Sequence, residues 1–366
     1  MKHIAIDARI INSSTGTYVE RLLHYLQEID KINKYSILVR AKDTEVWKPT
    51  ADNFTVRVAD FENYSFAEQT GFKKLLDNLS PDLVHFCMPQ QPILYKGTHV
   101  TTIHDLTLLR SYNSDKNWLV FHFKQLVGRF VFKRVAKTSR YVITDSIFTK
   151  NELLKLAKIP TEKLAVIPLA ADTHINKLSP YKHPYKQFIL YVGVQSDHKN
   201  IRLLGDAHQK LLQSHPNLGL ILVGNISGGA VNNKKYFETK GYQNIHFTGF
   251  LPDAERDWLY TNAVAYIFPS LMEGFGLPGL EAMGYGTPVV SSNATCLPEV
   301  YGDAAHYFDP KDVDDMTRAI NEVLTDDTLR NSLIDKGHKQ VTKYSWQRTA
   351  QQTHSIYVDA MFYDNK

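Results

Sequence analysis

Short runs rich in Ile, Val and Tyr alternate along the chain with longer stretches in which apolar residues recur every three or four positions. Continuous apolar runs are typical of strands buried on both faces, and the longer period is that of amphipathic helices. The alternation predicts an α/β fold of parallel sheets wound by helices. The expected strands form two series, residues 4–7, 35–39, 83–86, 100–103 and 141–144, and then 188–192, 218–223, 245–247, 264–268 and 288–291.

A polar stretch separates the two series. Its periodicity lapses, it contains Pro180 and Pro184, and a chain of 366 residues is too long for one ordinary core. At the end of the chain, apolar residues spaced by three or four predict a helix. We therefore predict a first domain over 1–170, a linker over 171–187, a second domain over 188–345 and a helix over 346–366 that returns to the first domain.

Composition excludes several classes of protein. Hydrophobic residues make up 43% of the chain and charged residues 22%, as in globular proteins, so a disordered or coiled-coil chain is excluded. The two cysteines, Cys87 and Cys296, suggest neither a disulfide framework nor a thiolate metal site. No apolar run approaches the ~20 residues that span a bilayer. We expect a cytoplasmic protein, at most peripheral at the inner face of the membrane.

The net charge of +4 comes from the first half of the chain, and the second half is slightly acidic. This asymmetry is too diffuse for a nucleic-acid groove, so no nucleic-acid partner is expected, but it suits an anionic acceptor or an acidic membrane surface. Residues 121–140 predict a helix with an apolar stripe and basic flanks. For this stripe we favour burial over membrane docking.

The most informative stretch follows the strand expected at 264–268. Glu273 precedes Gly274-Phe275-Gly276, and Glu281 lies inside the helix that should start near Pro278. Glycines let a ligand approach the main chain, and the first amides of a helix attract phosphate. Carboxylates accept hydrogen bonds from the hydroxyl pairs of a ribose or hexose. The stretch therefore predicts a nucleotide-sugar site.

Two motifs in this half of the chain suggest other chemistry. Residues 274–279 satisfy G-x-G-x-x-G, but in a dinucleotide-binding fold the glycines follow the strand directly, whereas here residues 269–273 intervene. A nicotinamide-dependent oxidoreductase is therefore disfavoured. Asp312-Val313-Asp314 could hold a divalent metal, but its place before an amphipathic stretch favours a helix cap.

The second half of the chain resembles the retaining glycosyltransferase family 4, whose GT-B architecture has two Rossmann-like parallel-sheet domains facing across a cleft. The resemblance rests on the E-x7-E motif from Glu273 to Glu281 and on segments in the family's order, at 249–252, 268–270, 287–290, 297–300 and 302–305. It implies that Glu281 holds the nucleotide ribose. It also implies a donor-sugar, diphosphate and base environment formed by Glu273 with Gly274, Phe275, Gly276, Leu277 and Phe250.

The segment after the strand at 188–192 resembles the family segment that carries adjacent Arg and Lys before Asn. Lys199 is retained, and the resemblance implies that it neutralises the leaving diphosphate. His198 stands where the family usually has Arg. Because imidazole is only partly protonated near neutrality and lacks the guanidinium fork, this departure bears on activity.

In the first half, His104-Asp105-Leu106 resembles the H-D-L segment of mannosyltransferase-like members. A histidine that ends a parallel strand points into the crevice where such folds bind ligands. The resemblance implies that His104 contacts the transferred sugar and that Asp105 helps position the sugar or the acceptor. Gly16 resembles the family's N-terminal glycine near the donor phosphates, with a plain helix-entry turn as the alternative. Ser146 is expected to cap a helix.

Together these features imply a retaining hexosyltransferase. The resemblance favours GDP-mannose as donor, with a saccharide or lipid-linked acceptor on the first domain and neither a metal nor another cofactor. The alternative is a non-catalytic nucleotide-sugar-binding or assembly protein derived from such an enzyme. His198 and the reduced N-terminal glycine loop motivate that alternative, which predicts binding without turnover.

Overall fold

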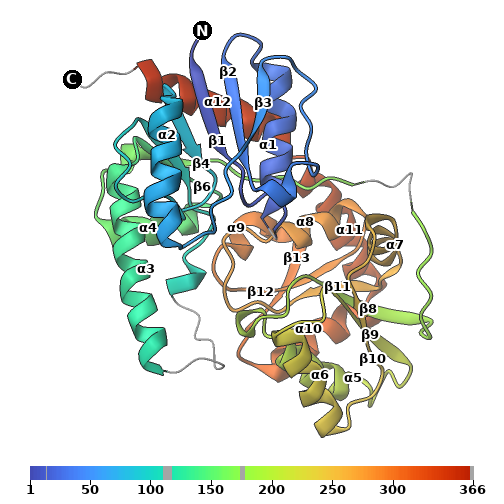
Figure 1. Cartoon of the computed structure of the whole chain (residues 1–366). Coiled ribbons are helices and arrows are strands. Elements are labelled where there is room, and N and C mark those ends of the chain that lie inside the picture. Colours follow the sequence, from blue (N-terminus) through green and yellow to red (C-terminus); the bar gives the residue numbers. More distant parts are fainter. Residues whose placement is uncertain (14, 110–117, 174–177, 363–366) are drawn as a thin grey trace. The chain divides into compact units, whose positions relative to one another are not determined.

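The computed structural model describes residues 1–13, 15–109, 118–173 and 178–362 (Figure 1). These residues form two compact units, one made of 1–109, 118–169 and 345–362, the other of 170–344. Residues 174–177 of the expected linker and 363–366 of the expected last helix lie outside the described residues, as does Ser14 in the first loop.

The first unit is built on a seven-stranded parallel sheet in the order β3-β2-β1-β4-β5-β6-β7. All five strands expected in this half are present, and β3 and β7 add to them. The strands are β1 (His3–Asp7), β2 (Lys34–Val39), β3 (Phe54–Val58), β4 (Leu83–Phe86), β5 (His99–Thr102), β6 (Tyr141–Thr144) and β7 (Leu164–Val166). The strand order reverses between β1 and β4, and parallel sheets bind ligands beyond the carboxyl ends of such a pair.

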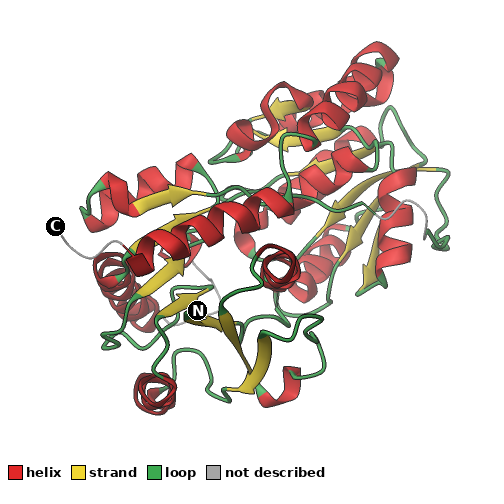
Figure 2. Cartoon of the chain, turned by 90° about the horizontal axis from the view of Figure 1, so that it is seen from above, coloured by secondary structure: helices red, strands yellow, loops and turns green. Residues whose placement is uncertain are grey.

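Helices lie against the strands of this sheet (Figure 2). They are α1 (Gly16–Ile29), α2 (Lys73–Leu79), α3 (Trp118–Thr138), α4 (Ile147–Ala157) and α12 (Trp346–Phe362), with a π-helix η2 (Glu68–Phe72) and 3-10 turns η1 (Ala41–Asp43), η3 (Thr107–Leu109) and η4 (Thr161–Lys163). Ser146 caps α4 by accepting a hydrogen bond from the Thr149 amide at 3.1 Å, as predicted.

The last helix, α12, returns to the first unit as predicted and packs along α1 (Figure 1). Its Tyr357 hydroxyl lies 2.6 Å from His85 Nδ1 on β4, and both side chains are fully buried. Burial lowers the pKa of His85 to about 3. The ring is therefore neutral where it joins the sheet to the C-terminal helix.

The second unit is a six-stranded parallel sheet in the order β10-β9-β8-β11-β12-β13. The five expected strands are present, and an edge strand, β13, adds to them. The strands are β8 (Gln187–Val192), β9 (Leu218–Val223), β10 (Ile245–Gly249), β11 (Ala265–Phe268), β12 (Val289–Ser292) and β13 (Ala305–Phe308). Here the order reverses between β8 and β11.

Seven helices, α5 to α11, accompany this sheet in the described part of the unit, with short turns between them. They are α5 (Ile201–Leu211), α6 (Gly229–Lys240), α7 (Asp253–Asn262), α8 (Leu277–Gly284), α9 (Leu297–Tyr301), α10 (Val313–Thr325) and α11 (Asp327–Val341), with the 3-10 turns η6 (Asp197–Lys199) and η7 (Gly302–Ala304). Asp312 caps α10 by accepting from the Asp314 amide at 2.8 Å, so the D-x-D motif is a helix cap, as predicted.

The prediction that the apolar stripe at 121–140 is buried is wrong for most of its described length. On α3, Leu126 is 65% exposed, Val127 45% and Phe130 58%. Towards its C-terminal end the helix does turn inward, because Phe132, Val135 and Ala136 lie in the core and Val131 packs against it. Val131 and Val135 belong to the expected stripe, so the prediction holds only for that end of the helix. The side chains of Phe121, Phe123 and Lys124 lie outside the described residues.

Among the described residues, none of the helices combines the length and apolar character needed to cross a membrane.

Candidate active site

The loops that follow β8 and β11 meet at the point where the strand order of the second unit reverses. Lys199 follows β8, Glu273 follows β11, and the Lys199 Nζ atom lies 2.6 Å from Glu273 Oε1. The two side chains are 19% and 11% exposed, so solvent screens this ion pair only partly. The structure thus brings together two of the residues that the sequence predicts for one site.

Asn200 ties the same loops together, a function that sequence reasoning did not assign. Its backbone is in the left-handed region at φ 60°, and its side chain donates to the carbonyl oxygens of Pro269 at 3.1 Å and Pro310 at 2.7 Å. The Leu271 amide donates to the His198 carbonyl at 2.8 Å. These bonds hold the loops after β8 and β11 together and so fix the position of Lys199.

The His198 ring lies beside the Ser196 hydroxyl, with Ser196 Oγ 3.2 Å from Nδ1. The ring therefore has a neighbour directly before its own turn, η6. A neutral imidazole donates from one ring nitrogen only, unlike the forked guanidinium usual in the family.

The glycine loop leads into α8 as the sequence predicts. Gly276 takes φ 96°, and its carbonyl accepts a hydrogen bond from the Tyr301 hydroxyl. A Cβ at Gly276 would lie 2.5 Å from that hydroxyl, so the tight turn requires glycine. No side chain caps α8, and an uncapped helix start is favourable for an anion such as phosphate.

Phe275 and Phe250 differ in how they can take part in binding. The Phe275 side chain is buried and packs edge-on against Tyr344 with ring centres 5.6 Å apart, so only its backbone can face a ligand. The Phe250 ring is 75% exposed directly after Gly249, which takes φ 77°. Gly274 and Leu277 lie on either side of the same turn, before and at the start of α8.

Glu281 lies one turn into α8 and is held by a neighbouring helix. The Tyr260 hydroxyl on α7 donates to Glu281 Oε2 at 3.1 Å. Burial raises the pKa of the Glu281 carboxyl, while the charge of Arg256 opposes that shift. The carboxylate retains capacity to accept hydrogen bonds, as ribose hydroxyls would require.

In the first unit, His104 sits between two acceptors. Its Nδ1 lies 2.7 Å from Asp145 Oδ2 and its Nε2 lies 3.2 Å from the Cys87 carbonyl oxygen. Burial acts to lower the pKa of His104, but the Asp145 carboxylate outweighs it, so the pKa is raised. The Tyr18 ring packs edge-on against the imidazole at 4.8 Å.

Asp145 is the residue that sequence reasoning missed at this place. It follows β6, whereas His104 follows β5, and the two strands are neighbours in the sheet. Its side chain is 2% exposed, and Oδ1 has no hydrogen-bond partner among the described residues. Asp105, the predicted neighbour of the sugar, accepts from the Thr107 amide at 2.8 Å and so caps the turn after it.

Gly16 begins α1, and a purely structural reason for the glycine is evident. A Cβ there would lie 1.9 Å from the carbonyl oxygen of Ile11. Position 16 therefore has no room for a side chain, and this holds whether or not the loop binds a ligand.

Both cysteines, Cys87 and Cys296, are buried and free. Within the described residues, no three or more His, Cys, Asp or Glu side chains come together as a metal site would require.

Comparisons with known proteins place the chain in a family. The family described as "Glycosyltransferase Family 4" matches residues 16–175, and "Glycosyl transferases group 1" matches 176–340. The O-antigen chain mannosyltransferase B of Escherichia coli is 32% identical over 70% of this chain and 69% of its own length. The chain belongs to the group 1 glycosyltransferases with a family 4 first domain, as the sequence motifs predict.

Other relatives and solved structures agree with this assignment. The serotype-specific mannosyltransferase WbdA of Escherichia coli is 28% identical over 94% of this chain, which spans only 44% of that relative. Sucrose-phosphate synthase from Thermosynechococcus elongatus has a TM-score of 0.77 at 18% identity, covering 98% of this chain and 99% of that one. Anabaena HepE in complex with UDP and glucose has a TM-score of 0.73 at 16% identity, covering 98% and 99%. The fold is thus the GT-B architecture.

Proposed function

We propose that the protein is a retaining hexosyltransferase that moves mannose from GDP-mannose to a saccharide or lipid-linked acceptor without a metal ion. The observation that carries the proposal is the Lys199–Glu273 pair beside the uncapped start of α8, at the reversal point of the second sheet. Mannose as the transferred sugar is supported by the names of the relatives, of which the chain spans 69% in one case and 44% in another.

In this proposal the second unit binds the donor. The diphosphate lies at the start of α8, where main-chain amides and Lys199 supply positive charge. Glu273 accepts hydrogen bonds from hydroxyls of the sugar, and Glu281 from those of the ribose. Phe250 contacts the base in the same proposal. His104, of the first unit, contacts the transferred sugar.

The chemistry follows from where charge develops. The bond between the anomeric carbon and the diphosphate oxygen breaks, and Lys199 with the loop amides stabilises the negative charge of the departing diphosphate. The acceptor hydroxyl forms the new bond on the same face of the sugar and passes its proton to a phosphate oxygen of the leaving group. Retention then requires no protein carboxylate in line behind the anomeric carbon.

Binding and turnover separate this proposal from a non-catalytic nucleotide-sugar-binding protein, which the His198 substitution favours. Calorimetric titration with GDP, UDP and ADP in EDTA should give the tightest binding for GDP. The same preparation should slowly hydrolyse GDP-mannose. Binding without hydrolysis, even with a panel of saccharide acceptors present, would favour the non-catalytic function, and absence of binding would remove the nucleotide site.

We also propose that the first unit contacts an anionic membrane surface through α3. Exposed Leu126, Val127 and Phe130 are interleaved with exposed basic residues, which are Arg129, Lys133, Arg134 and Lys137. Beside them lies a cavity of about 220 Å³ whose lining is part apolar and part charged, formed by Leu106, Leu109, Arg129, Glu152, Lys155 and Leu156. Apolar side chains flanked by Lys and Arg are favourable at an acidic lipid interface.

A further inference from the structure

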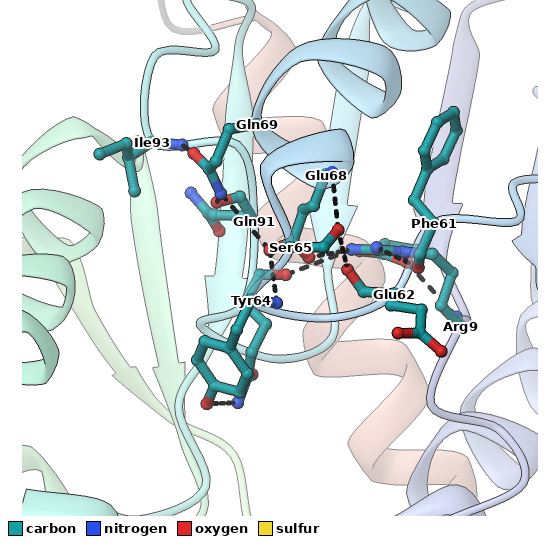
Figure 3. A network of polar contacts seen from close by, with 11 residues as sticks. Arg9, Phe61, Glu62, Tyr64, Ser65, Glu68, Gln69, Gln91 and Ile93 are labelled. Carbon is teal, nitrogen blue, oxygen red and sulfur yellow. Dashed lines mark hydrogen bonds and ion pairs between the residues drawn. The ribbon is translucent and has the colours of Figure 1, made fainter. Parts of the chain in front are cut away.

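A buried ion cluster lies at the reversal point of the first sheet, beyond the end of β1 (Figure 3). The Arg9 guanidinium lies 2.8 Å from Asp7 Oδ2 and 2.9 Å from Glu68 Oε1, and the three side chains are 1%, 6% and 1% exposed. It also lies 4.0 Å from the centre of the Phe72 ring. Burying three ionised groups is weak evidence for stability, so the cluster calls for another explanation.

The cluster fixes the loop that precedes η2. Arg9 Nη1 donates to the Phe61 carbonyl at 3.0 Å, and the Tyr64 amide donates to Glu68 Oε2 at 3.0 Å. Tyr64 is thereby held at φ 62°, a conformation that is strained for a bulky residue. Strained backbone and π-helices such as η2 both concentrate at functional sites.

The loop before η2 carries an exposed aromatic residue, Tyr64. The Tyr64 side chain points away from the ion cluster in Figure 3, and the residue is 64% exposed. Its hydroxyl accepts a hydrogen bond from Gln90 Nε2, from the segment after β4. A tyrosine hydroxyl is protonated near neutral pH, so it can also donate a hydrogen bond to a ligand.

Gln90 offers an unused acceptor at the same place. The residue is 5% exposed, and its Oε1 has no hydrogen-bond partner among the described residues. Buried polar atoms are normally paired, and an unpaired one in an otherwise satisfied network is a place for a water, an ion or a ligand group. Gln90 follows β4 and Asp7 ends β1, the two strands between which the sheet order reverses.

We propose that Tyr64 and Gln90 form a subsite for a hexose ring of the acceptor. The apolar face of the pyranose packs on the Tyr64 ring, a sugar hydroxyl donates to Gln90 Oε1, and the Tyr64 hydroxyl donates to a sugar oxygen. The buried Arg9 cluster positions the loop that carries the ring. The identity of the ligand as the acceptor rests on the proposed function, whereas the subsite itself does not.

The test uses the full chain and saturation-transfer NMR with three probes, methyl α-D-mannoside, methyl β-D-glucoside and the methyl β-glycoside of N-acetylglucosamine. At least one probe should bind the wild type. Tyr64→Ala and Gln90→Met should each weaken that binding about fivefold, the order expected for one aromatic contact or one hydrogen bond. Phe362→Ala is the matched control, since Phe362 is also 64% exposed and contacts Lys2 at the amino end of β1.

GDP titration of every variant separates the two claims. Unchanged GDP binding shows that a variant is folded and that its substitution does not affect the donor site. Equal glycoside binding by wild type and Tyr64→Ala, or no glycoside binding by a wild type that binds GDP, overturns the subsite and leaves the proposed function standing. A chain that loses glycosides on Tyr64→Ala but never binds GDP keeps the subsite and overturns the proposed function. If Tyr64→Ala does not fold, Tyr64→Asn repeats the test, because Asn tolerates positive φ.

Discussion

Lys199 Nζ lies 2.6 Å from Glu273 Oε1, and this bond joins two loops that are 74 residues apart in the chain. Each residue lies in the loop that follows one of the two strands between which the order of the second sheet reverses. The ammonium group is thereby held in a fixed position by Glu273 and by the turn that Asn200 closes. A preorganised cation next to an uncapped helix start is suited to stabilising a departing diphosphate.

Replacing Lys199 should lower the rate of turnover and have little effect on the stability of the fold. Lys199→Met is expected to slow the release of mannose from GDP-mannose about 100-fold or more, the usual effect of removing one stabilising donor. Lys336→Met is the matched control, because Lys336 pairs with Asp303 at 3.2 Å on the surface of the same unit. Equal rates for the wild type and Lys199→Met would contradict the role of Lys199.

Restoring the guanidinium usual in the family should raise activity. His198→Arg is expected to increase the rate of GDP-mannose turnover severalfold, because arginine stays charged at all working pH values and donates from a planar fork. The wild-type imidazole lacks that fork in either protonation state. A rate for His198→Arg that is equal to or below the wild-type rate would show that His198 is not a weakened form of that cation.

The His104–Asp145 pair predicts a pH-dependent stability. Burial opposes the shift, but Asp145 raises the pKa of His104 above its ordinary value of about 6.5. The pair therefore contributes fully below pH 6.5 for as long as Asp145 stays ionised, and its contribution is lost as pH rises through the raised pKa of His104. Because burial raises the pKa of Asp145, the contribution also falls at acid pH. The free energy of unfolding lost in Asp145→Asn should be about 1 kcal/mol larger at pH 6 than at pH 9 in urea unfolding.

A control for that experiment is Asp43→Asn, since Asp43 is also buried but pairs with Asn12 at 3.0 Å. The charged and titratable groups that act on His104 are Asp145 and Asp105, and His85 is coupled to it. A loss in Asp145→Asn that is equal at both pH values would mean that the pair is a neutral hydrogen bond.

Replacing Glu281 should raise the stability of the protein and lower its affinity for the nucleotide. Because burial raises the pKa of its carboxyl, the ionised form opposes folding as pH rises above the ordinary value of about 4.3. Glu281→Gln should therefore unfold at a slightly higher temperature at pH 7. Its affinity for GDP should fall about tenfold, the value of one hydrogen bond to a charged group. Unchanged affinity in calorimetry would remove Glu281 from the ribose site.

The exposed face of α3 predicts lipid binding. Wild-type protein should sediment with vesicles containing an anionic phospholipid, and Leu126→Ser with Phe130→Ser should weaken that binding while GDP affinity is unchanged. Added salt should also weaken the binding, because salt screens the attraction between the basic residues and the anionic headgroups. Binding that is equal for anionic and neutral vesicles, or unaffected by the two substitutions, would count against this surface.

Most of the strands that could be predicted are buried on both faces, and the half-buried edge strand β10 is the exception. β13 was missed because Ala305–Phe308 is short, includes a half-buried His306 and follows a 3-10 turn. β3 lies at the sheet edge, where Phe54 is buried but Val58 is exposed, so neither an apolar run nor a strict alternation marks it.

The candidate site could be predicted only in part. The glycine loop and its carboxylates lie within one strand-loop-helix unit, so their spacing is visible in the sequence. The His104–Asp145 contact spans 41 residues and depends on β5 and β6 being neighbours, which no local pattern reveals. The contact between Arg9 and Glu68 is also invisible in any local pattern, because it joins residues far apart in the chain. The face of α3 that turns inward depends on how the helix packs against the sheet.

The central claim is that GDP-mannose is turned over with retention of configuration. The most direct measurement is proton NMR of the first mannose released from GDP-α-mannose by the wild-type chain in EDTA, read before the anomers equilibrate. The account predicts α-mannose first, with release strongly reduced in Lys199→Met. β-Mannose as the first product, or release unaffected by that substitution, would contradict it.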